Sequence, residues 1–320
     1  MVYAIKVDQC HMNEPFHYRV AIVIPLLNGG EPWVNCLSAL KRSLGDFYHV
    51  LIVDSGSSDG SNALASSAGF DLLSIDKGDF DHGGTRQVAA DYLMDFEFLV
   101  FMTQDAILAS LGGIENLLSA FSDSEVGVAY GRQLPRDGAS PIEAHARLFN
   151  YPEQSNKRTL ADKSKLGIKA AFTSNSFAAY RTKALVDVGG FPSKLILGED
   201  MVVAARMLLV GWSVAYVADA QVYHSHGYTV LQEFKRYFDI GVMHQDQSWI
   251  LDTFGKPEGE GMRFIRSELS YLAKTAPWMI PQAVARTFAK YAGYKLGLKA
   301  LRFPVRMRRM MSMSKNFWNH

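Results

Sequence analysis

The sequence predicts an α/β fold with a mainly parallel central sheet, followed by a helical C-terminal extension. Short apolar runs alternate with segments of helical periodicity over the first 130 residues, as in chains built from strand-helix-strand units. From residue 229 onward the apolar spacing is helical throughout. We therefore expect two regions, residues 1–228 and residues 229–320. With 320 residues, of which 48% are hydrophobic, the chain can bury a large core.

Four strands are expected in the first half of the chain, and each ends in a polar loop. They are short, apolar and bounded by turn-forming residues: residues 20–25, 49–53, 72–75 and 96–102. Pro32 opens the helix after the first strand, because proline is favoured at the first helical position. The inward face of this helix would hold Trp33, Leu37, Leu40 and Leu44. The helix before the fourth strand would turn Val88, Tyr92 and Leu93 inward.

The second half of the chain is less regular at first. Residues 135–168 contain prolines at irregular positions and are expected to form a loop over the site. A strand over 170–181, a helix that begins near Glu199 and a strand over 213–218 should follow. In open α/β sheets a ligand binds outside the carboxyl ends of the strands. The polar residues that follow the strands are therefore the candidates for a functional site.

The net charge of +1 conceals an uneven distribution of charge. After Glu268 the chain has no acidic residue but ten basic ones, and apolar residues such as Trp278 and Phe288 lie among them. This region could lie on an anionic membrane surface, or it could be a solvated basic face packed on the rest of the protein. Binding of nucleic acid is not favoured, because no nucleic-acid-binding signature accompanies the charge.

Only two cysteines are present, Cys10 and Cys36, too few for a disulfide framework or a zinc site of four cysteines. The first 16 residues lack a basic segment followed by a long apolar run. No stretch reaches the roughly 20 apolar residues that span a bilayer. We therefore expect a cytoplasmic protein.

Asp54 follows an apolar strand and precedes the loop SGSSDGS. Its carboxylate could accept the N3 hydrogen of a uracil or thymine ring, with Asp59 assisting. The alternative is a local role, because Asp is favoured in turns and caps. The loop has neither the dinucleotide-binding nor the P-loop glycine pattern, which counts against NAD enzymes and ATPases.

The segment HGGTR is a candidate for binding a diphosphate. Gly83 and Gly84 would let the backbone approach phosphate closely, and the helix that follows would offer free N–H groups. Arg86 and His82 could then donate hydrogen bonds to phosphate oxygens. An ordinary glycine-rich turn is the alternative.

Asp105 follows a buried strand and is a candidate ligand for a divalent cation, Mg²⁺ or Mn²⁺. His224, after the last strand, is the best second ligand, with His226 behind it. A histidine ligand suits Mn²⁺ somewhat better than Mg²⁺. The alternative for each histidine is a structural role.

Glu199 and Asp200 lie at the start of an expected helix, where the helix dipole stabilises acidic groups. Their role could therefore be purely structural. One of these carboxylates could instead remove a proton from an attacking hydroxyl group, which requires hydrogen-bond reach.

Taken together and in this order, the segments VIPLLN, VDSGSSDGS, FDHGGTR, TQDA, TSNS, GED and VYHSH resemble the family 2 inverting glycosyltransferases of the GT-A fold. FDHGGTR and TQDA are similar to segments of the bacterial rhamnosyltransferases of polysaccharide and O-antigen assembly. The resemblance covers residues 18–228, and RYFDIGVMHQDQSWIL also resembles the C-terminal region of such enzymes.

The resemblance implies transfer of L-rhamnose from dTDP-β-L-rhamnose, with inversion, onto a hydroxyl of a lipid-linked saccharide at the cytoplasmic membrane face. The basic region would then contact the inner-membrane surface. Asp200 would be the catalytic base beside Glu199. The family's Asp-x-Asp metal motif is Thr103-Gln104-Asp105 here, so one carboxylate remains and a supporting ligand such as His224 gains importance.

The resemblance also implies a set of substrate contacts. Donor contacts are expected from Pro25, Asn28, Asp54, Ser55, Asp59, His82, Gly83, Gly84, Arg86, Gln104 and Asp105. Acceptor contacts are expected from Asn175, Trp212 and His226.

Three other functions compete with this prediction. The donor could be another UDP-, dTDP- or GDP-sugar. A sugar-phosphate nucleotidyltransferase would be expected to have a basic glycine-rich loop after its first strand, where this chain has PLLNGGEP. A non-catalytic nucleotide-sugar-binding protein would not need Asp54, Asp105 and Asp200 together.

Overall fold

The computed structural model describes residues 19–44, 48–255 and 259–319. Cys10 lies outside these residues, and Cys36 is buried and free. Within them, one nine-stranded sheet has the order β3-β2-β1-β4-β8-β6-β9-β5, and β7 pairs with β9. The strands are β1 (Val20–Leu26), β2 (His49–Asp54), β3 (Asp71–Ser74), β4 (Phe98–Met102), β5 (Ile107–Leu108), β6 (Val126–Leu134), β7 (Asn156–Arg158), β8 (Phe177–Arg181) and β9 (Ser213–Tyr223).

The direction of β8 determines which loops meet. β1 to β4 are parallel to one another, β6 is parallel to β9, and β8 runs antiparallel between β4 and β6. Six of these nine strands therefore point the same way, which confirms the mainly parallel α/β sheet. Because β8 is reversed, its amino end lies beside the carboxyl ends of β4, β6 and β9. The loops at these four ends form the candidate site.

Helices cover both faces of the sheet. On β1, Ile22 and Ile24 pack in the same core cluster as Trp33, whereas Ala21 and Val23 pack with residues of α3 and α8. This alternation is the period of a strand buried on both faces. The helices up to this point of the chain are α1 (Gly30–Ser43), α2 (Ser61–Ser67), α3 (His82–Tyr92), α4 (Gly113–Leu118), α5 (Pro141–Asn150), α6 (Lys163–Leu166), α7 (Thr182–Asp187) and α8 (Glu199–Leu209).

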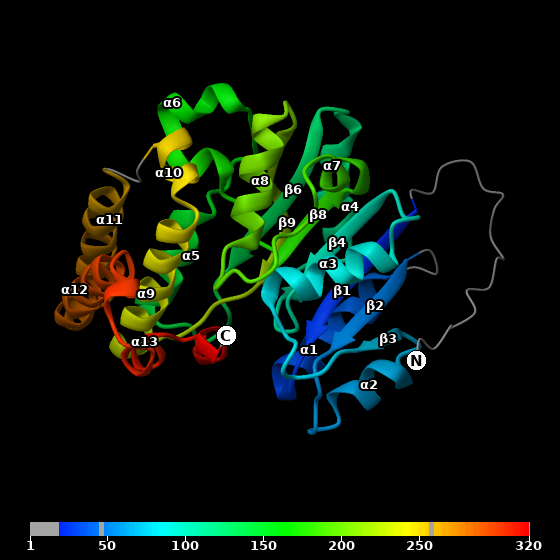
Figure 1. Cartoon of the computed structure of the whole chain (residues 1–320), viewed down its shortest axis with the longest axis horizontal. Coiled ribbons are helices and arrows are strands. Elements are labelled where there is room, and N and C mark those ends of the chain that lie inside the picture. Colours follow the sequence, from blue (N-terminus) through cyan, green and yellow to red (C-terminus); the bar gives the residue numbers. More distant parts are fainter. Residues whose placement is uncertain (1–18, 45–47, 256–258, 320) are drawn as a thin grey trace.

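The C-terminal helices gather on one side of the sheet (Figure 1). They are α9 (Val230–Asp246), α10 (Ser248–Phe254), α11 (Glu260–Thr275), α12 (Ile280–Gly297) and α13 (Val305–Met311). The backbones of α9 and α12 touch, because a Cβ atom added to Gly293 or Gly297 would lie 2.2 or 2.1 Å from a carbonyl oxygen of α9. None of the described helices is long and apolar enough to cross a bilayer.

Three local expectations need correction. Residues 135–168 are not a loop throughout, because they contain α5, β7, a short 3₁₀ helix over Leu160–Asp162 and α6. Val88 and Tyr92 of α3 are 48% and 46% exposed, since the small residues Ala89 and Ala90 form the face toward the sheet. The strand expected over 170–181 begins only at Phe177.

Candidate active site

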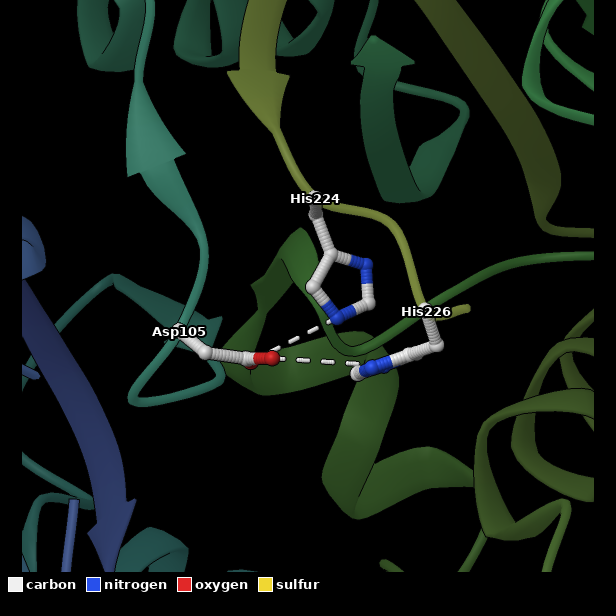
Figure 2. Close-up of side chains that lie close together, drawn as sticks. All are labelled: Asp105, His224 and His226. Atoms are coloured by element: carbon white, nitrogen blue, oxygen red, sulfur yellow. Dashed lines mark ion pairs between the residues drawn. The ribbon is translucent and has the colours of Figure 1, made fainter. Parts of the chain in front are cut away.

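Asp105, His224 and His226 form a group of potential metal ligands at the edge of the sheet. One ligand atom of each lies within 4.8 Å of those of the others. Nε2 of His224 is 3.4 Å from one carboxylate oxygen of Asp105, and Nε2 of His226 is 3.9 Å from the other (Figure 2). Asp105 follows β4 and both histidines follow β9, so the sheet brings together residues that are more than 100 positions apart.

The hydrogen bonds of Gln133 fix the orientation of the His224 ring. Oε1 of Gln133 accepts a hydrogen bond from Nη1 of Arg147 at 2.7 Å, so this atom is the amide oxygen. The same oxygen lies 2.9 Å from Nδ1 of His224, which must therefore carry the hydrogen. In the neutral ring Nε2 then has a lone pair that faces the Asp105 carboxylate. A cation between these two acceptors makes the arrangement favourable, so the residues fit a divalent metal ion.

Burial favours the neutral form of both histidines. It lowers the pKa of His224, and together with His224 it lowers the pKa of His226 to about 4. Burial alone would raise the pKa of Asp105, but its contacts with His224, Thr103 and His226 hold that pKa well below its usual range. Two neutral imidazoles and one carboxylate can serve as ligands to a metal such as Mn²⁺.

A second group of polar residues surrounds the start of α8. Glu199 is buried and forms an ion pair with Arg86 of α3, with 3.0 Å between Oε1 and Nη1. Asn175 donates from its side chain to Glu199 and from its backbone N–H to Asp200, both at 3.2 Å. The side-chain oxygen of Asn175 accepts from the Tyr180 hydroxyl at 2.7 Å. Asn175 therefore holds both carboxylates in place.

The neighbouring carboxylates of Glu199 and Asp200 have opposite pKa shifts. Burial would raise the pKa of Glu199, but the charge of Arg86 opposes it and the pKa is lowered. Burial, and then the negative charge of Glu199, raises the pKa of Asp200 to about 7. A carboxylate that titrates near neutral pH is suited to accept a proton during a reaction.

Gln133 also links the two groups. Its Nε2 atom donates to the Ser174 hydroxyl at 2.9 Å, and Ser174 precedes the Asn175 that binds Glu199 and Asp200. A short chain of hydrogen bonds and backbone therefore connects His224 with Asp200.

Asp54 and Ser55 at the end of β2 form hydrogen bonds with nearby residues of the protein. Asp54 is 4% exposed, and its carboxylate accepts the N–H of Gly56 at 3.3 Å and that of Ser57 at 3.2 Å. The Ser55 hydroxyl donates to the carbonyl of Leu26 at 3.1 Å. These contacts are the local turn role that was the alternative for Asp54, and contact with a pyrimidine stays a prediction.

The other predicted donor residues near β1 connect loops. The side-chain oxygen of Asn28 accepts the N–H of Ser58 at 2.8 Å, and Asp59 accepts the N–H of Gly30 at 3.1 Å. These bonds join the loop after β1 to the loop after β2, so the two loops form one surface. Asn28 and Asp59 remain partly available to a ligand, because both bonds lie in exposed surroundings.

Gln104 joins the ends of β1 and β4, and its predicted contact with the donor stays a prediction. Its side-chain oxygen accepts the N–H of Leu27 at 2.8 Å, and its side-chain amide donates to the Leu27 carbonyl at 3.2 Å. The side chain thus extends the pairing of β1 with β4 beyond the strand ends. Pro25 lies within β1 itself.

The structure corrects the prediction that the N–H groups of HGGTR are free to bind a diphosphate. The Asp81 carboxylate accepts the N–H groups of Gly83 and Gly84, each at 3.3 Å, and so caps α3. Gly83 permits close packing, because an added Cβ would lie 1.8 Å from the Pro192 carbonyl oxygen. The Arg86 guanidinium forms an ion pair with Glu199. His82 is exposed at the start of α3, and contact of His82, Gly83, Gly84 and Arg86 with the donor stays a prediction.

The predicted acceptor residues do not lie together. Trp212 precedes β9, whereas His226 follows the other end of this eleven-residue strand. The Trp212 indole donates to Asp187 at 3.3 Å, so an acceptor contact is not supported there. Asn175 binds the two carboxylates of α8, and His226 lies with the potential metal ligands.

Gln133 and Arg136 belong to the site but were not predicted from the sequence. Arg136 donates from Nη2 to the Asp105 carboxylate at 3.0 Å. A signal was present for Gln133, because Arg132 and Gln133 interrupt an apolar run near the end of a buried strand. Arg136 follows that strand by two positions, in a segment that was expected to be an irregular loop.

Comparison with known proteins identifies related chains. The model of glycosyl transferase family 2 matches residues 21–189, and that of glycosyl transferase family group 2 matches residues 110–307. The O-antigen chain rhamnosyltransferase RfbN of Salmonella typhimurium is 46% identical over 94% of this chain and 96% of that protein. The O-antigen chain rhamnosyltransferase WbaN of Salmonella anatum is 43% identical over 93% and 95% of the two chains.

Solved structures agree on the fold. The mannosyltransferase PcManGT of Pyrobaculum calidifontis, solved with GDP-Man and Mn²⁺, has a TM-score of 0.56 at 19% identity over 95% of this chain and 85% of that chain. TarS of S. aureus has a TM-score of 0.52 at 16% identity over 88% and 55%. The likeness confirms the expected GT-A fold.

We predict that Arg86→Met destabilises the protein by about 3 kcal/mol, because it leaves Glu199 buried without its cationic partner. Urea unfolding of the two proteins at pH 7 measures the difference. The matched control is Arg263→Met, which removes an exposed ion pair with Glu260 and should cost less than about 1 kcal/mol. Equal stability of the two variants would contradict the role given to the buried pair.

Proposed function

This chain belongs to glycosyl transferase family 2, and we propose that it transfers L-rhamnose from a nucleotide sugar to a growing O-antigen saccharide. The observation that carries the proposal is the buried pair Glu199 and Asp200, held by Asn175 and connected through Ser174 and Gln133 to the potential metal group around Asp105. Two O-antigen rhamnosyltransferases that match almost the whole chain support rhamnose as the sugar.

The proposed donor is dTDP-β-L-rhamnose, bound along the loops that follow β1, β2 and β4. Asp54, Asp59 and Asn28 would meet the nucleoside. Asp105, His224 and His226 would hold a divalent cation, Mg²⁺ or Mn²⁺, which supplies positive charge to the diphosphate. PcManGT, solved with GDP-Man and Mn²⁺, supports such a pair of ligands for a related fold.

Asp200 is the proposed general base. Its carboxylate accepts the proton of an acceptor hydroxyl as the hydroxyl oxygen forms a bond to the anomeric carbon. The bond from that carbon to the diphosphate oxygen breaks on the opposite face, and the nucleoside diphosphate leaves. Attack opposite to the leaving group inverts the configuration, so a β-linked donor gives an α-L-rhamnoside. Burial and the charge of Glu199 keep the pKa of Asp200 high, and Asn175 keeps its carboxylate in position.

The proposed acceptor is a lipid-linked saccharide at the cytoplasmic face of the membrane, and residues 229–320 are proposed to contact that membrane. One side of α12 packs on α9, whereas Phe288 and Tyr291 on another side are 69% and 64% exposed. Trp278, just before α12, is 74% exposed. Exposed aromatic residues in a region without acidic residues after Glu268 suit the interface of an anionic bilayer.

We predict that Asp200→Asn lowers rhamnosyl transfer by about a hundredfold or more, because an amide cannot accept the proton. Transfer by the unchanged protein should fall as the pH drops through about 7, where Asp200 becomes protonated. Both are measured by chromatography of the product formed from dTDP-β-L-rhamnose and a lipid-linked saccharide, over a range of pH values.

The controls separate loss of the base from loss of the fold. Asp200→Asn should keep the rise in unfolding temperature that the donor causes, since Asp200 is not a proposed donor ligand. Exposed Asp252, changed to Asn, should leave transfer and its pH profile unaltered. Near-normal transfer by Asp200→Asn would exclude Asp200 as the base.

We predict that Phe288→Glu combined with Tyr291→Glu weakens binding to phosphatidylglycerol vesicles by about tenfold or more, because two interfacial aromatic groups become acidic. Co-sedimentation with vesicles measures binding, and added salt should weaken binding of the unchanged protein. The control is Leu111→Glu, which changes a residue that is 66% exposed outside this region. Equal binding to uncharged phosphatidylcholine vesicles, or no binding at all, would refute the proposal.

A further inference from the structure

Arg136 places a permanent positive charge on the one carboxylate of the potential metal group. Its Nη2 atom lies 3.0 Å from the Asp105 carboxylate and also donates to the Asp105 backbone carbonyl. Both side chains are largely buried. The positive charge of Arg136 therefore largely offsets the negative charge of Asp105 within the group.

The backbone fixes Arg136 in this position. The N–H of Arg136 donates to the hydroxyl of Ser225 at 3.2 Å, and Ser225 is buried between the two histidines. The N–H of His224 donates to the carbonyl of Leu134 at 3.0 Å. The loop that carries Arg136 is therefore bonded to the loop that carries His224 and His226. Arg136 is a constituent of the group, and its contact with Asp105 is not an incidental surface contact.

The guanidinium of Arg136 still has an unused donor. Nε of Arg136 is buried without a hydrogen-bond partner among the described residues. A buried N–H without a partner is unfavourable, and an acceptor oxygen supplied by a ligand would satisfy it. A guanidinium presents its donors in a fixed planar array that matches two oxygens of a phosphate.

A metal ion alone has a poor site here. A divalent cation that approaches Asp105 meets a carboxylate already paired with Arg136, and the two cations repel each other. A diphosphate brings negative charge that both cations can share. Each ligand should therefore improve the binding of the other, and by the same factor.

We propose that Arg136 binds the diphosphate of the nucleotide, so that nucleotide binds partly without metal, whereas metal binds well only together with nucleotide. The proposal rests on the proposed function for the nature of the ligand, a nucleoside diphosphate. It assigns Arg136 a direct contact with the leaving group and explains how the site operates with a single carboxylate in its Thr103-Gln104-Asp105 motif.

The test is calorimetric titration of the full chain with dTDP in the presence of EDTA, and separately with Mn²⁺ alone. We expect Arg136→Gln to weaken metal-free binding of dTDP by at least about tenfold, because a charged hydrogen-bond donor is lost. The same variant should bind Mn²⁺ alone more tightly, because the repulsion is removed. Arg136→Lys should keep Mn²⁺ binding weak and recover part of the dTDP binding.

The opposite effects of Arg136→Gln on dTDP affinity and on Mn²⁺ affinity distinguish ligand binding from a purely structural role. If Arg136 only held its loop, Arg136→Gln would weaken both dTDP and Mn²⁺, and this result would overturn the proposal. Unchanged metal-free binding of dTDP would overturn it as well. Arg263→Gln, at an exposed ion pair, is the control and should alter neither titration.

Failure of the proposed function would give a different result. If the unchanged protein binds none of dTDP, UDP and GDP even with Mn²⁺, the nucleotide-sugar function is wrong and the proposal for Arg136 falls with it. If the protein binds dTDP with Mn²⁺ but not in EDTA, the function stands and the proposal for Arg136 is refuted.

Discussion

The ion pair between Arg86 and Glu199 holds α3 against α8, and the environment of Asp200 depends on it. Gly83 lets the two helices approach, since no Cβ would fit beside the Pro192 carbonyl, and Asp81 caps the first turn of α3. The pair keeps Glu199 charged, and that charge, with burial, raises the pKa of Asp200. The segment HGGTR therefore helps to build the surroundings of a carboxylate more than 100 positions away.

The reversed strand β8 supplies the second constraint. By running antiparallel between β4 and β6, it places Ser174 and Asn175 beside the loops that follow β4, β6 and β9. Gln133 then bonds to both His224 and Ser174, and the adjacent Asn175 bonds to both acidic residues of α8. The potential metal group and the carboxylate pair are consequently parts of one network. The network can thus hold the Asp105 and Asp200 side chains in a fixed position relative to each other.

Several strands and two residues of the site could be predicted from local sequence patterns. Apolar runs located β1, β2 and β4, and the polar residues that follow strands located Asp105 and His224, because these signals depend on neighbouring residues alone. The role of HGGTR could not be predicted in that way. Its glycines indicate an anion site, but Asp81 occupies the N–H groups, and the partner of Arg86 lies on a distant helix. Gln133 and Arg136 were missed because their partners come from other strands, and the order of those strands is a property of the whole sheet.

The proposed function requires that nucleotide and metal bind together at Asp105. Anomalous X-ray scattering from crystals grown with Mn²⁺ and dTDP tests it most directly. We expect an Mn²⁺ peak within ligand distance of the Asp105 carboxylate and Nε2 of His224, with phosphate oxygens completing the shell. A peak held by other residues, such as Asp76 and Asp79 in the hollow beside β3 and α3, would contradict it.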